Sequence, residues 1–270
     1  MNFPHKLQTL YKPVQPTIKS SEKSVIYREV KPNEKLSDFI YCYWKLQTTE
    51  TLQTPFNYRV VADGCIDIFF ALERPNESFV MGFCKKYTEF PLGNSFHYIG
   101  VRFLPSMFPQ LFKIDASELS NRYEWLQEIL PQISTFILHE FDQVMPFEDI
   151  QNVLDAYFLN LLKHKHFDWD LRFYNAMYLI LKNFGTLETE SALDTGISPR
   201  QLRRIFNYYV GTTPKTFSKV VRFQNILHAK PSTESLKQNK LFYDVGFYDQ
   251  AHFIKDFKNF YGVTPSQAFR

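Results

Sequence analysis

The C-terminal end of the chain carries the same spaced pattern of residues twice. The first copy consists of Ala192, Gly196, Leu202, Phe206, Gly211, Thr213 and Pro214, and the second of Phe242, Gly246, Phe253, Phe257, Gly262, Thr264 and Pro265. A glycine supplies a left-handed turn between two short helices, and apolar residues four apart share one face of a helix. Each Thr-Pro pair offers a capping residue and a proline suited to the first helical position. The repeat therefore predicts two similar units, each with two short helices joined by a glycine turn.

The second helix of each unit is expected to have one apolar face and one polar face. In the first copy, Leu202, Ile205 and Phe206 share one arc of a helical wheel, and Arg200, Arg203, Arg204 and Asn207 share the opposite arc. In the second copy, Phe253, Phe257 and Phe260 form the inner arc, and Ala251, His252, Lys255, Lys258 and Asn259 point away. Arginine binds both the guanine edge in a major groove and DNA phosphate, so this face favours a recognition helix. A solvated surface face is the alternative.

These segments resemble a known family of DNA-binding domains. Residues 196–206, 211–214, 221–224, 244–258 and 262–265 are similar to the DNA-binding domain of AraC/XylS-type transcription regulators, over about residues 170 to 270. The resemblance implies seven helices, in which two helix-turn-helix subdomains are joined by one long helix, here Lys215 to about His228. It also implies that each recognition helix enters a major groove on the same side of the DNA.

The resemblance, together with the wheel, gives candidate DNA-binding residues. They are Arg200, Arg203, Arg204 and Asn207 in the first recognition helix and Gln250, Ala251, His252 and Lys255 in the second. Phe242 stands where the family usually has alanine, which suggests a repacked second subdomain and leaves open whether that subdomain still reads bases. Ile254 occupies a position where a polar residue is commoner, and it could meet a thymine methyl group or belong to the core.

The preceding part of the chain is expected to be a small β-sandwich or barrel followed by helices, which makes the whole chain α+β. Residues 39–46, 56–61, 65–72, 79–83 and 96–103 are short β-branched and aromatic runs, and Asp63-Gly64 is typical of a hairpin. From residue 116 onward, apolar and aromatic residues recur at helical spacing in two stripes. The first stripe is Leu119, Tyr123, Leu126, Ile129 and Leu130, and the second is Val153, Leu154, Tyr157, Phe158, Leu161 and Leu162. These stripes are core or the contact with a second subunit.

Three regions are therefore predicted. Residues 1–24 lack periodicity and are expected to form a mobile tail, residues 25–167 a sensor or oligomerisation domain, and residues 168–270 the DNA-binding domain. From residue 168 onward there are 14 Lys and Arg against 9 Asp and Glu, a net charge of +5, which leaves −2 for residues 1–167. The positive charge lies with the repeated motif, as binding to DNA phosphate requires.

The composition gives no sign of export, metal or cofactor. The sequence has neither a signal peptide nor a membrane span, and Cys42, Cys65 and Cys84 lack the spacing of a zinc or redox site. His164 and His166 fit an exposed helix end better than a metal pair. We expect a cytoplasmic protein that binds no metal and no cofactor.

The residues before the DNA-binding region carry a second resemblance. Tyr43-Trp44, residues 62–64 and residues 100–105 resemble the amino-terminal domain of some AraC-type regulators, which senses a small molecule or mediates dimerisation. No ligand-binding residue can be carried over. Arg59, Asp63, Asp67 and Arg102 lie near predicted strands and could line a pocket, but capping of turns or exposure to solvent is favoured.

The sequence therefore predicts a sequence-specific DNA-binding transcription regulator that is not an enzyme. Its expected partner is double-stranded DNA. Three further partners are possible: RNA polymerase, a small-molecule effector and a second copy of the chain. No membrane is expected as a partner. The alternative is an enzyme fused to the same DNA-binding domain, either a DNA-repair protein that accepts alkyl groups or a small β-barrel metalloenzyme. The first would need an active thiol and the second further histidines on strands, where His97 stands alone.

Overall fold

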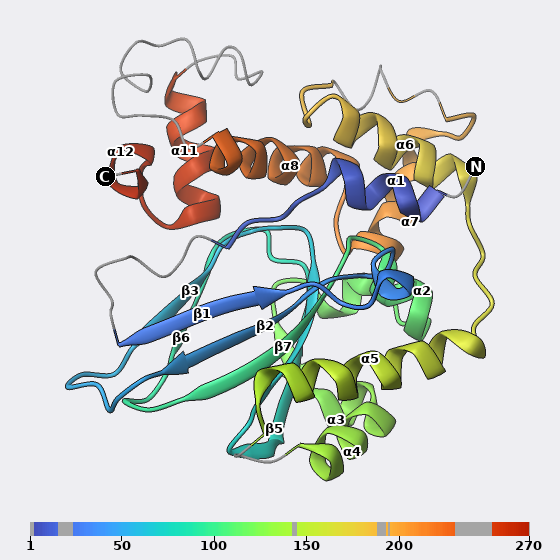
Figure 1. Ribbon diagram of the computed structural model, residues 1–270. Helices are drawn as coiled ribbons and strands as arrows, with labels where there is room; N and C mark the ends of the chain where they lie inside the picture. Colours follow the sequence, from blue (N-terminus) through green and yellow to red (C-terminus); the bar gives the residue numbers. More distant parts are fainter. Residues whose placement is uncertain are drawn as a thin grey trace.

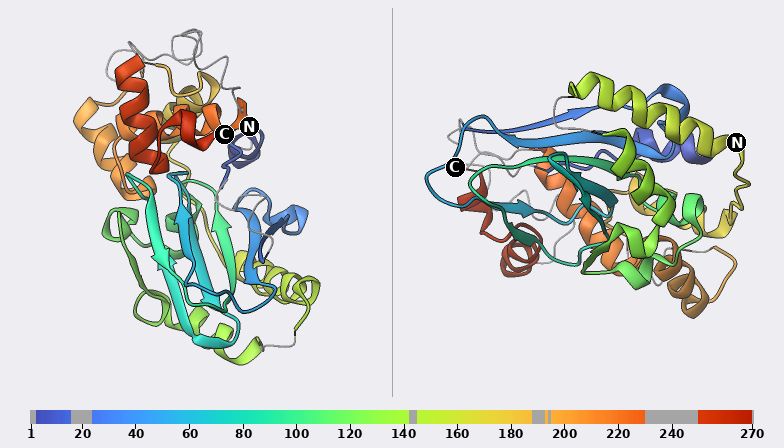
Figure 2. Two further views of the ribbon diagram at one scale, coloured as in Figure 1. Left: turned by 90° about the vertical axis from the view of Figure 1, so that its left-hand side faces the viewer. Right: turned by 90° about the horizontal axis from the view of Figure 1, so that it is seen from below.

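An antiparallel sheet region precedes a C-terminal helical region, as predicted (Figure 1). The structure is a computed structural model that describes residues 3–15, 24–141, 145–187, 193, 195–229 and 250–269. Figure 2, in its left view, shows the C-terminal helices gathered at one end of the sheet. The α+β class is confirmed.

The larger sheet has six antiparallel strands in the order β1-β2-β7-β4-β5-β8. The strands are β1 (Val25–Val30), β2 (Ile40–Thr48), β4 (Ile66–Ala71), β5 (Arg74–Met81), β7 (His97–Phe103) and β8 (Tyr123–Trp125). Strand β7 lies in the centre, where Arg102 is the register partner of both Cys42 and Asp67. This pairing brings together three residues that are far apart in the sequence.

A second sheet of two strands covers part of one face of the larger sheet. It consists of β3 (Asn57–Val60) and β6 (Thr88–Pro91). The predicted hairpin at Asp63-Gly64 is wrong, because β3 pairs with β6 whereas β4 pairs with β5 and β7. Gly64 does adopt a left-handed turn, with φ +75°, but this turn leads from one sheet to the other. The result is the predicted small β-sandwich.

Short and long helices cover the opposite face and the end of the larger sheet. They are the 3₁₀ helices η1 (Glu34–Leu36) and η2 (Ala116–Leu119), and the α-helices α2 (Met107–Phe112), α3 (Leu126–Ile129), α4 (Pro131–Glu140) and α5 (Phe147–Lys163). Helix α5 runs along the sheet (Figure 1), where the Tyr43 hydroxyl donates to Asp155 at 2.9 Å. The ring of Phe158 lies 5.7 Å from that of Phe103.

The two apolar stripes of the sequence have different outcomes. The stripe that includes Leu154 and Phe158 forms the buried face of α5, as a core helix requires. The stripe from Leu119 to Leu130 is not one helix, because η2 ends at Leu119, strand β8 follows at Tyr123, and only then does α3 begin. Residues 123–125 pair with β5 at the edge of the sheet, and this pairing outweighs the helical spacing.

The expectation of a mobile tail at residues 1–24 is wrong for residues 3–15. Helix α1 (Phe3–Leu10) packs beside α6 (Leu171–Lys182), with Leu7 and Tyr11 buried. Gln15 is also buried, and its amide donates to the carbonyl of Val61 at 2.9 Å. Leu7 and Tyr11 are four residues apart, which is the spacing of a helix with one buried face.

The remaining helices form the C-terminal region. They are α6, α7 (Pro199–Val210), α8 (Pro214–Ala229), α11 (Gln250–Tyr261) and α12 (Pro265–Ala268). The predicted long helix from Lys215 to about His228 is α8. Ala192 of the first repeat, and Phe242 and Gly246 of the second, lie outside the described residues.

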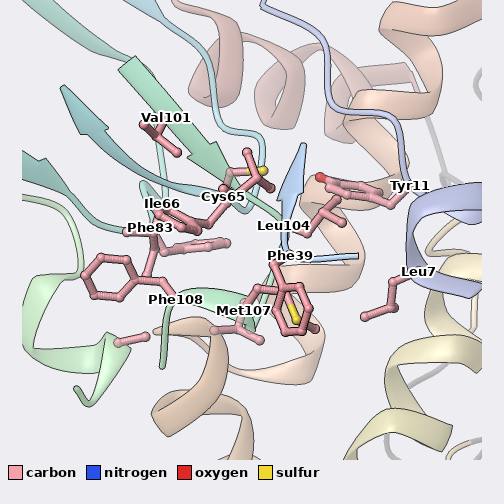
Figure 3. Close-up of a cluster of buried hydrophobic side chains, with 14 of the residues drawn as sticks. Leu7, Tyr11, Phe39, Cys65, Ile66, Phe83, Val101, Leu104, Met107 and Phe108 are labelled. Carbon is pink, nitrogen blue, oxygen red and sulfur yellow. The ribbon is translucent and has the colours of Figure 1, made fainter. Parts of the chain in front are cut away.

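One hydrophobic core runs through both regions. It extends from Leu7 and Tyr11 through the sheet to Phe217 of α8 and Phe257 of α11. Figure 3 shows this cluster, in which side chains of the N-terminal segment, the strands and α2 lie together, among them Tyr11, Ile66 and Met107. The helical region is therefore packed against the sheet region.

Candidate nucleic-acid interface

Helix α7 is the first predicted recognition helix, and it is capped at both ends. Ser198 is the N-cap, and its hydroxyl accepts a hydrogen bond from the amide of Gln201 at 3.3 Å. Pro199 occupies the first turn, where a missing amide hydrogen costs nothing. Gly211 ends the helix in the left-handed conformation, with φ +83°. These local signals fix the helix at the place that the sequence predicts.

The two faces of α7 are those of the helical wheel. Leu202 and Phe206 are buried, with Phe206 fully inaccessible to solvent. Arg200, Arg203 and Arg204 are exposed, and Asn207 is half-buried on the same side. Together with Ser198 and Gln201, these four side chains line one shallow hollow on the surface. The predicted residues of the first helix therefore lie together on one accessible face.

Helix α8 connects the two predicted subdomains. The Thr213 hydroxyl accepts from the amide of Thr216 at 3.2 Å, and Pro214 begins the helix. In the first half of α8, the Lys219 ammonium lies 3.0 Å from the Asp256 carboxylate of α11. The capping role predicted for Thr213 is confirmed, and the same holds for Thr264, which forms a capping box with Gln267.

Helix α11 is the second predicted recognition helix. Phe253, Phe257 and Phe260 are buried, as the wheel predicts. Gln250, Ala251, His252 and Lys255 are all exposed. Ile254 is 37% exposed, so it does not belong to the core. The predicted residues of the second helix again share an exposed face.

The C-terminal end of α11 contacts the sheet region. The side-chain amide of Asn259 donates to the carbonyl of Lys85 at 3.0 Å, and the Asn259 carbonyl accepts from the amide of Tyr87 at 3.1 Å. The Phe260 carbonyl accepts from the amide of Ala62 at 3.3 Å. Asn259, which the wheel places with the outward residues, therefore binds the sheet region through its side chain.

Helix α8 contacts the sheet region and the N-terminal segment through Gln224. Its buried amide group donates to the carbonyl of Ala62 at 2.8 Å and accepts from the amide of Val14 at 2.7 Å. The ring of Phe217 lies 6.2 Å from that of Tyr11. The helix that joins the two recognition helices is thus fixed to residues 11–15 and 61–64.

The four charged residues near the strands do not all lie where we expect. Arg59 is at the surface, paired with Glu89 at 2.6 Å. Arg102 is only 2% exposed and forms ion pairs with Asp67 at 2.9 Å and with Asp63 at 3.3 Å. Exposure to solvent is therefore the wrong expectation for Arg102, because these carboxylates compensate its buried charge. Asp63 additionally caps a turn, since its carboxylate accepts from the amide of Cys65 at 3.0 Å.

Arg102 and Asp67 line a cavity, which is the less favoured of the two expectations for these residues. The sequence does not show that the two side chains meet, because Asp67 and Arg102 are 35 residues apart and are brought together by strand register. Within the described ranges, no group of three or more metal-ligating side chains occurs. None of the helices described is both long and apolar enough to cross a membrane.

Two segments of the chain match known domain families. Residues 192–270 match the family described as a helix-turn-helix domain, and residues 28–125 match a domain of unknown function (DUF6597). A Haemophilus influenzae protein named as an uncharacterized HTH-type transcriptional regulator is 40% identical over 65 residues, which are 24% of this chain. The match spans 21% of the length of that relative.

The comparison with solved structures finds matches to one protein. ToxT from Vibrio cholerae is 12% identical with a TM-score of 0.42, over 92% of this chain and 98% of that chain. An apo form of a ToxT variant is 14% identical with a TM-score of 0.44, over 92% and 97% of the two chains. The domain match covers α7, α8, α11 and α12, and the chain therefore carries a helix-turn-helix domain at its C-terminal end.

Proposed function

We propose that the protein is a sequence-specific DNA-binding transcription regulator that inserts α7 and α11 into successive major grooves. The observation that carries this proposal is the exposed arginine face of α7, within a segment that matches a helix-turn-helix domain. Arg200, Arg203 and Arg204 offer the forked donors that pair with guanine O6 and N7. A solvated surface face can also carry three arginines, but their place within the helix-turn-helix match favours binding to DNA.

The second recognition helix supports the same reading of DNA. Gln250 and His252 carry groups that can bond to base edges, and Lys255 can pair with phosphate. All three are exposed, and the buried phenylalanines of α11 hold the helix against its neighbours. Because Phe242 lies outside the described residues, the proposal for this helix rests on α11 itself.

The division of labour within the chain is also a proposal. Residues 25–167 form the modulating domain and residues 168–270 the DNA-binding domain, with contacts from Gln224 and Asn259 between them. The distribution of charge supports this division, since the excess of Lys and Arg over Asp and Glu lies in residues 168–270. RNA polymerase and a second copy of the chain stay predicted partners.

The enzymatic alternatives gain no support from the thiols. Burial raises the pKa of Cys42 and Cys65 well above the ordinary value and that of Cys84 to about 11. A thiol that accepts alkyl groups reacts as the thiolate, so it needs a lowered pKa. The three buried thiols therefore give the DNA-repair alternative no support.

Selection of bound DNA from a random pool with the full chain tests the proposal. We expect an enriched motif with two segments about 10 base pairs, or roughly 34 Å, apart on one face of the duplex. A single enriched segment would restrict base reading to one helix, and the absence of any enriched motif would overturn the proposed function.

Replacement of Arg204 with alanine then tests the contact itself. We expect a loss of about 1 to 3 kcal/mol in binding free energy and a relaxed preference at one base position. The control is Arg74→Ala, which removes an exposed arginine at the start of β5. An equal loss on every DNA sequence, with a shallower salt dependence, would make Arg204 a phosphate contact.

A further inference from the structure

A cavity of about 210 Å³ lies between the two sheets. Its walls are mainly aromatic and include Trp44, Phe69, Phe79, Phe90, Tyr98 and Tyr123. Tyr123 is 50% exposed, and a side chain so accessible belongs to the outer edge of the cavity. An apolar cavity of about 150 Å³ holds a benzene molecule. The cavity between the sheets is therefore large enough for a small molecule with one aromatic ring.

One part of the cavity wall is charged. Asp67 and Arg102 are the charged residues that line the cavity, and both are buried. The Asp67 carboxylate accepts from Arg102 Nη2 at 2.9 Å and from the indole nitrogen of Trp44 at 2.9 Å. The wall is therefore a fixed hydrogen-bonded assembly.

This assembly holds more negative than positive groups. Arg102 also lies 3.2 Å from Glu29 and 3.3 Å from Asp63, so three carboxylates surround one guanidinium. Burial and the neighbouring Asp63 raise the pKa of Asp67 to about 6, although Arg102 acts in the opposite direction. A positive charge placed in the cavity would stabilise the ionised Asp67, and a negative charge would not.

The donors of Arg102 and Trp44 are directed mainly at acidic groups. Each of the three nitrogens of Arg102 donates to an oxygen of Tyr27, Glu29 or Asp67, and the Trp44 nitrogen donates to Asp67. An anion in the cavity would compete with these carboxylates for Arg102 and be repelled by them. A cation meets no such competition, and the faces of aromatic rings attract positive charge.

We propose that this cavity binds a small organic cation, an amine or quaternary ammonium group on an apolar or aromatic body. The aromatic walls hold the body, and Asp67 attracts the charge, while Glu29 and Asp63 behind the wall help to compensate the charge of Arg102. Aromatic rings combined with negative charge are a recurrent solution for recognition of ammonium groups.

The charged wall is connected to the helical region. Asp63, which pairs with Arg102, accepts from the side-chain amide of Gln15 at 2.7 Å. The adjacent residues Val14 and Ala62 bond to Gln224 of α8. As an effector site the cavity rests on the proposed function, because its ligand would act on DNA binding through these contacts. As a binding site it does not depend on that function.

Titration of the full chain with three probes tests the ligand class. Benzyltrimethylammonium is the cation, neopentylbenzene its neutral analogue of the same shape, and phenylacetate the anion. We expect the cation to bind about tenfold more tightly than the neutral probe, and the anion not to bind. Equal or tighter binding of the neutral probe or of the anion would overturn the proposal, as would the failure of the cation to bind.

Two variants locate the binding site. Asp67→Asn removes the charge of the wall, and we expect it to lose the preference for the cation over the neutral probe. The control is Asp155→Asn. It removes a carboxylate of α5 that contacts Tyr43 on the opposite face of the same sheet, and it should keep that preference. Should Asp67→Asn fail to fold, Phe69→Leu, which removes one aromatic wall, should weaken cation binding, and unchanged binding would overturn the proposal.

Measurement of DNA binding with and without the cation separates the two proposals. If the cation binds but leaves DNA affinity unchanged, the binding site stands and its effector role is overturned. If no DNA sequence is selected while the cation still binds, the proposed function is overturned and the binding site stands. If DNA is selected but no cation binds, the proposed function stands and the cation-binding site is overturned.

Discussion

Gly100 shows how one missing side chain shapes the cavity. A Cβ atom at this position would lie 2.0 Å from Cε2 of Trp44, so the indole ring occupies the space that a side chain would fill. This close approach holds the indole nitrogen within reach of Asp67. The glycine is therefore needed for the position of Trp44.

We expect Gly100→Ala to displace Trp44 and to lower the free energy of unfolding by about 1 to 3 kcal/mol, the usual cost of an overfilled core. Binding of benzyltrimethylammonium should weaken as well. Thermal unfolding and probe titration measure the two effects. Gly93→Ala is the control, because the nearest atom to its Cβ would be 3.7 Å away. Equal stability of both variants would contradict this role of Gly100.

His97 gives the stability of the protein a pH dependence. Burial and the nearby Lys45 lower its pKa from 6.5 to about 4, so the folded protein keeps this histidine neutral where the unfolded chain protonates it. The unfolded state then binds more protons between about pH 4 and 6.5, and stability is lost as the pH falls through this range.

We expect His97→Gln to remove this part of the acid sensitivity. The difference in unfolding free energy between the variant and the wild type should shift in favour of the variant as the pH falls from 6.5 to 4. Denaturant titrations at several pH values measure the shift. A difference that is independent of pH would show that His97 titrates normally in the folded protein.

At the scale of elements, the glycine turns that define the repeat have different surroundings. Gly196 and Gly211 both have positive φ, +72° and +83°. A Cβ at Gly196 would meet no atom within 4 Å, whereas at Gly211 it would lie 2.5 Å from the Ser120 hydroxyl. Gly211 therefore serves both the turn after α7 and the contact of that helix with residues 116–120.

Alanine at the two glycines separates these roles. Gly196→Ala should cost about 1 to 2 kcal/mol, the price of a left-handed conformation alone. Gly211→Ala should cost more, because the Ser120 side chain and the Ala116 carbonyl must also move. Urea unfolding of both variants provides the comparison. A smaller loss of unfolding free energy for Gly211→Ala than for Gly196→Ala would show that residues 116–120 can move away at little cost.

Elements with strong local signals are those that the sequence predicts well. The caps at Thr213 and Thr264 and the apolar spacing of α7 and α11 are local, so the two exposed faces follow from helical geometry. Five of the strands are also found close to their expected positions. Strands β1, β6 and β8 are not predicted, because the pairing of short edge strands depends on partners elsewhere in the chain.

The charged wall of the cavity illustrates the same limit for sites. Glu29, Asp63, Asp67 and Arg102 come from separate segments, and each alone is typical of a surface residue. Their meeting depends on the register of β7 with β2 and β4. Hydrophobic alternation predicts that strands form, but it does not say which strands become neighbours.

At the scale of the whole molecule, the continuous core joins the sheet region to the C-terminal helices. We expect thermal unfolding of the full chain to be one cooperative transition, in which the calorimetric and van't Hoff enthalpies agree. Far-ultraviolet circular dichroism and tryptophan fluorescence should report the same midpoint. Two resolved transitions would contradict the shared core and indicate two independently folding units.

The contacts of Gln224 limit how freely this helix-turn-helix unit can be exchanged between proteins. Its side chain bonds to backbone groups of Val14 and Ala62, two places that belong to a different part of the chain. A chimaera that joins residues 168–270 to a foreign sensor would leave this buried amide without partners. The two halves are thus not interchangeable modules, and substitutions on one side of the contact constrain those tolerated on the other.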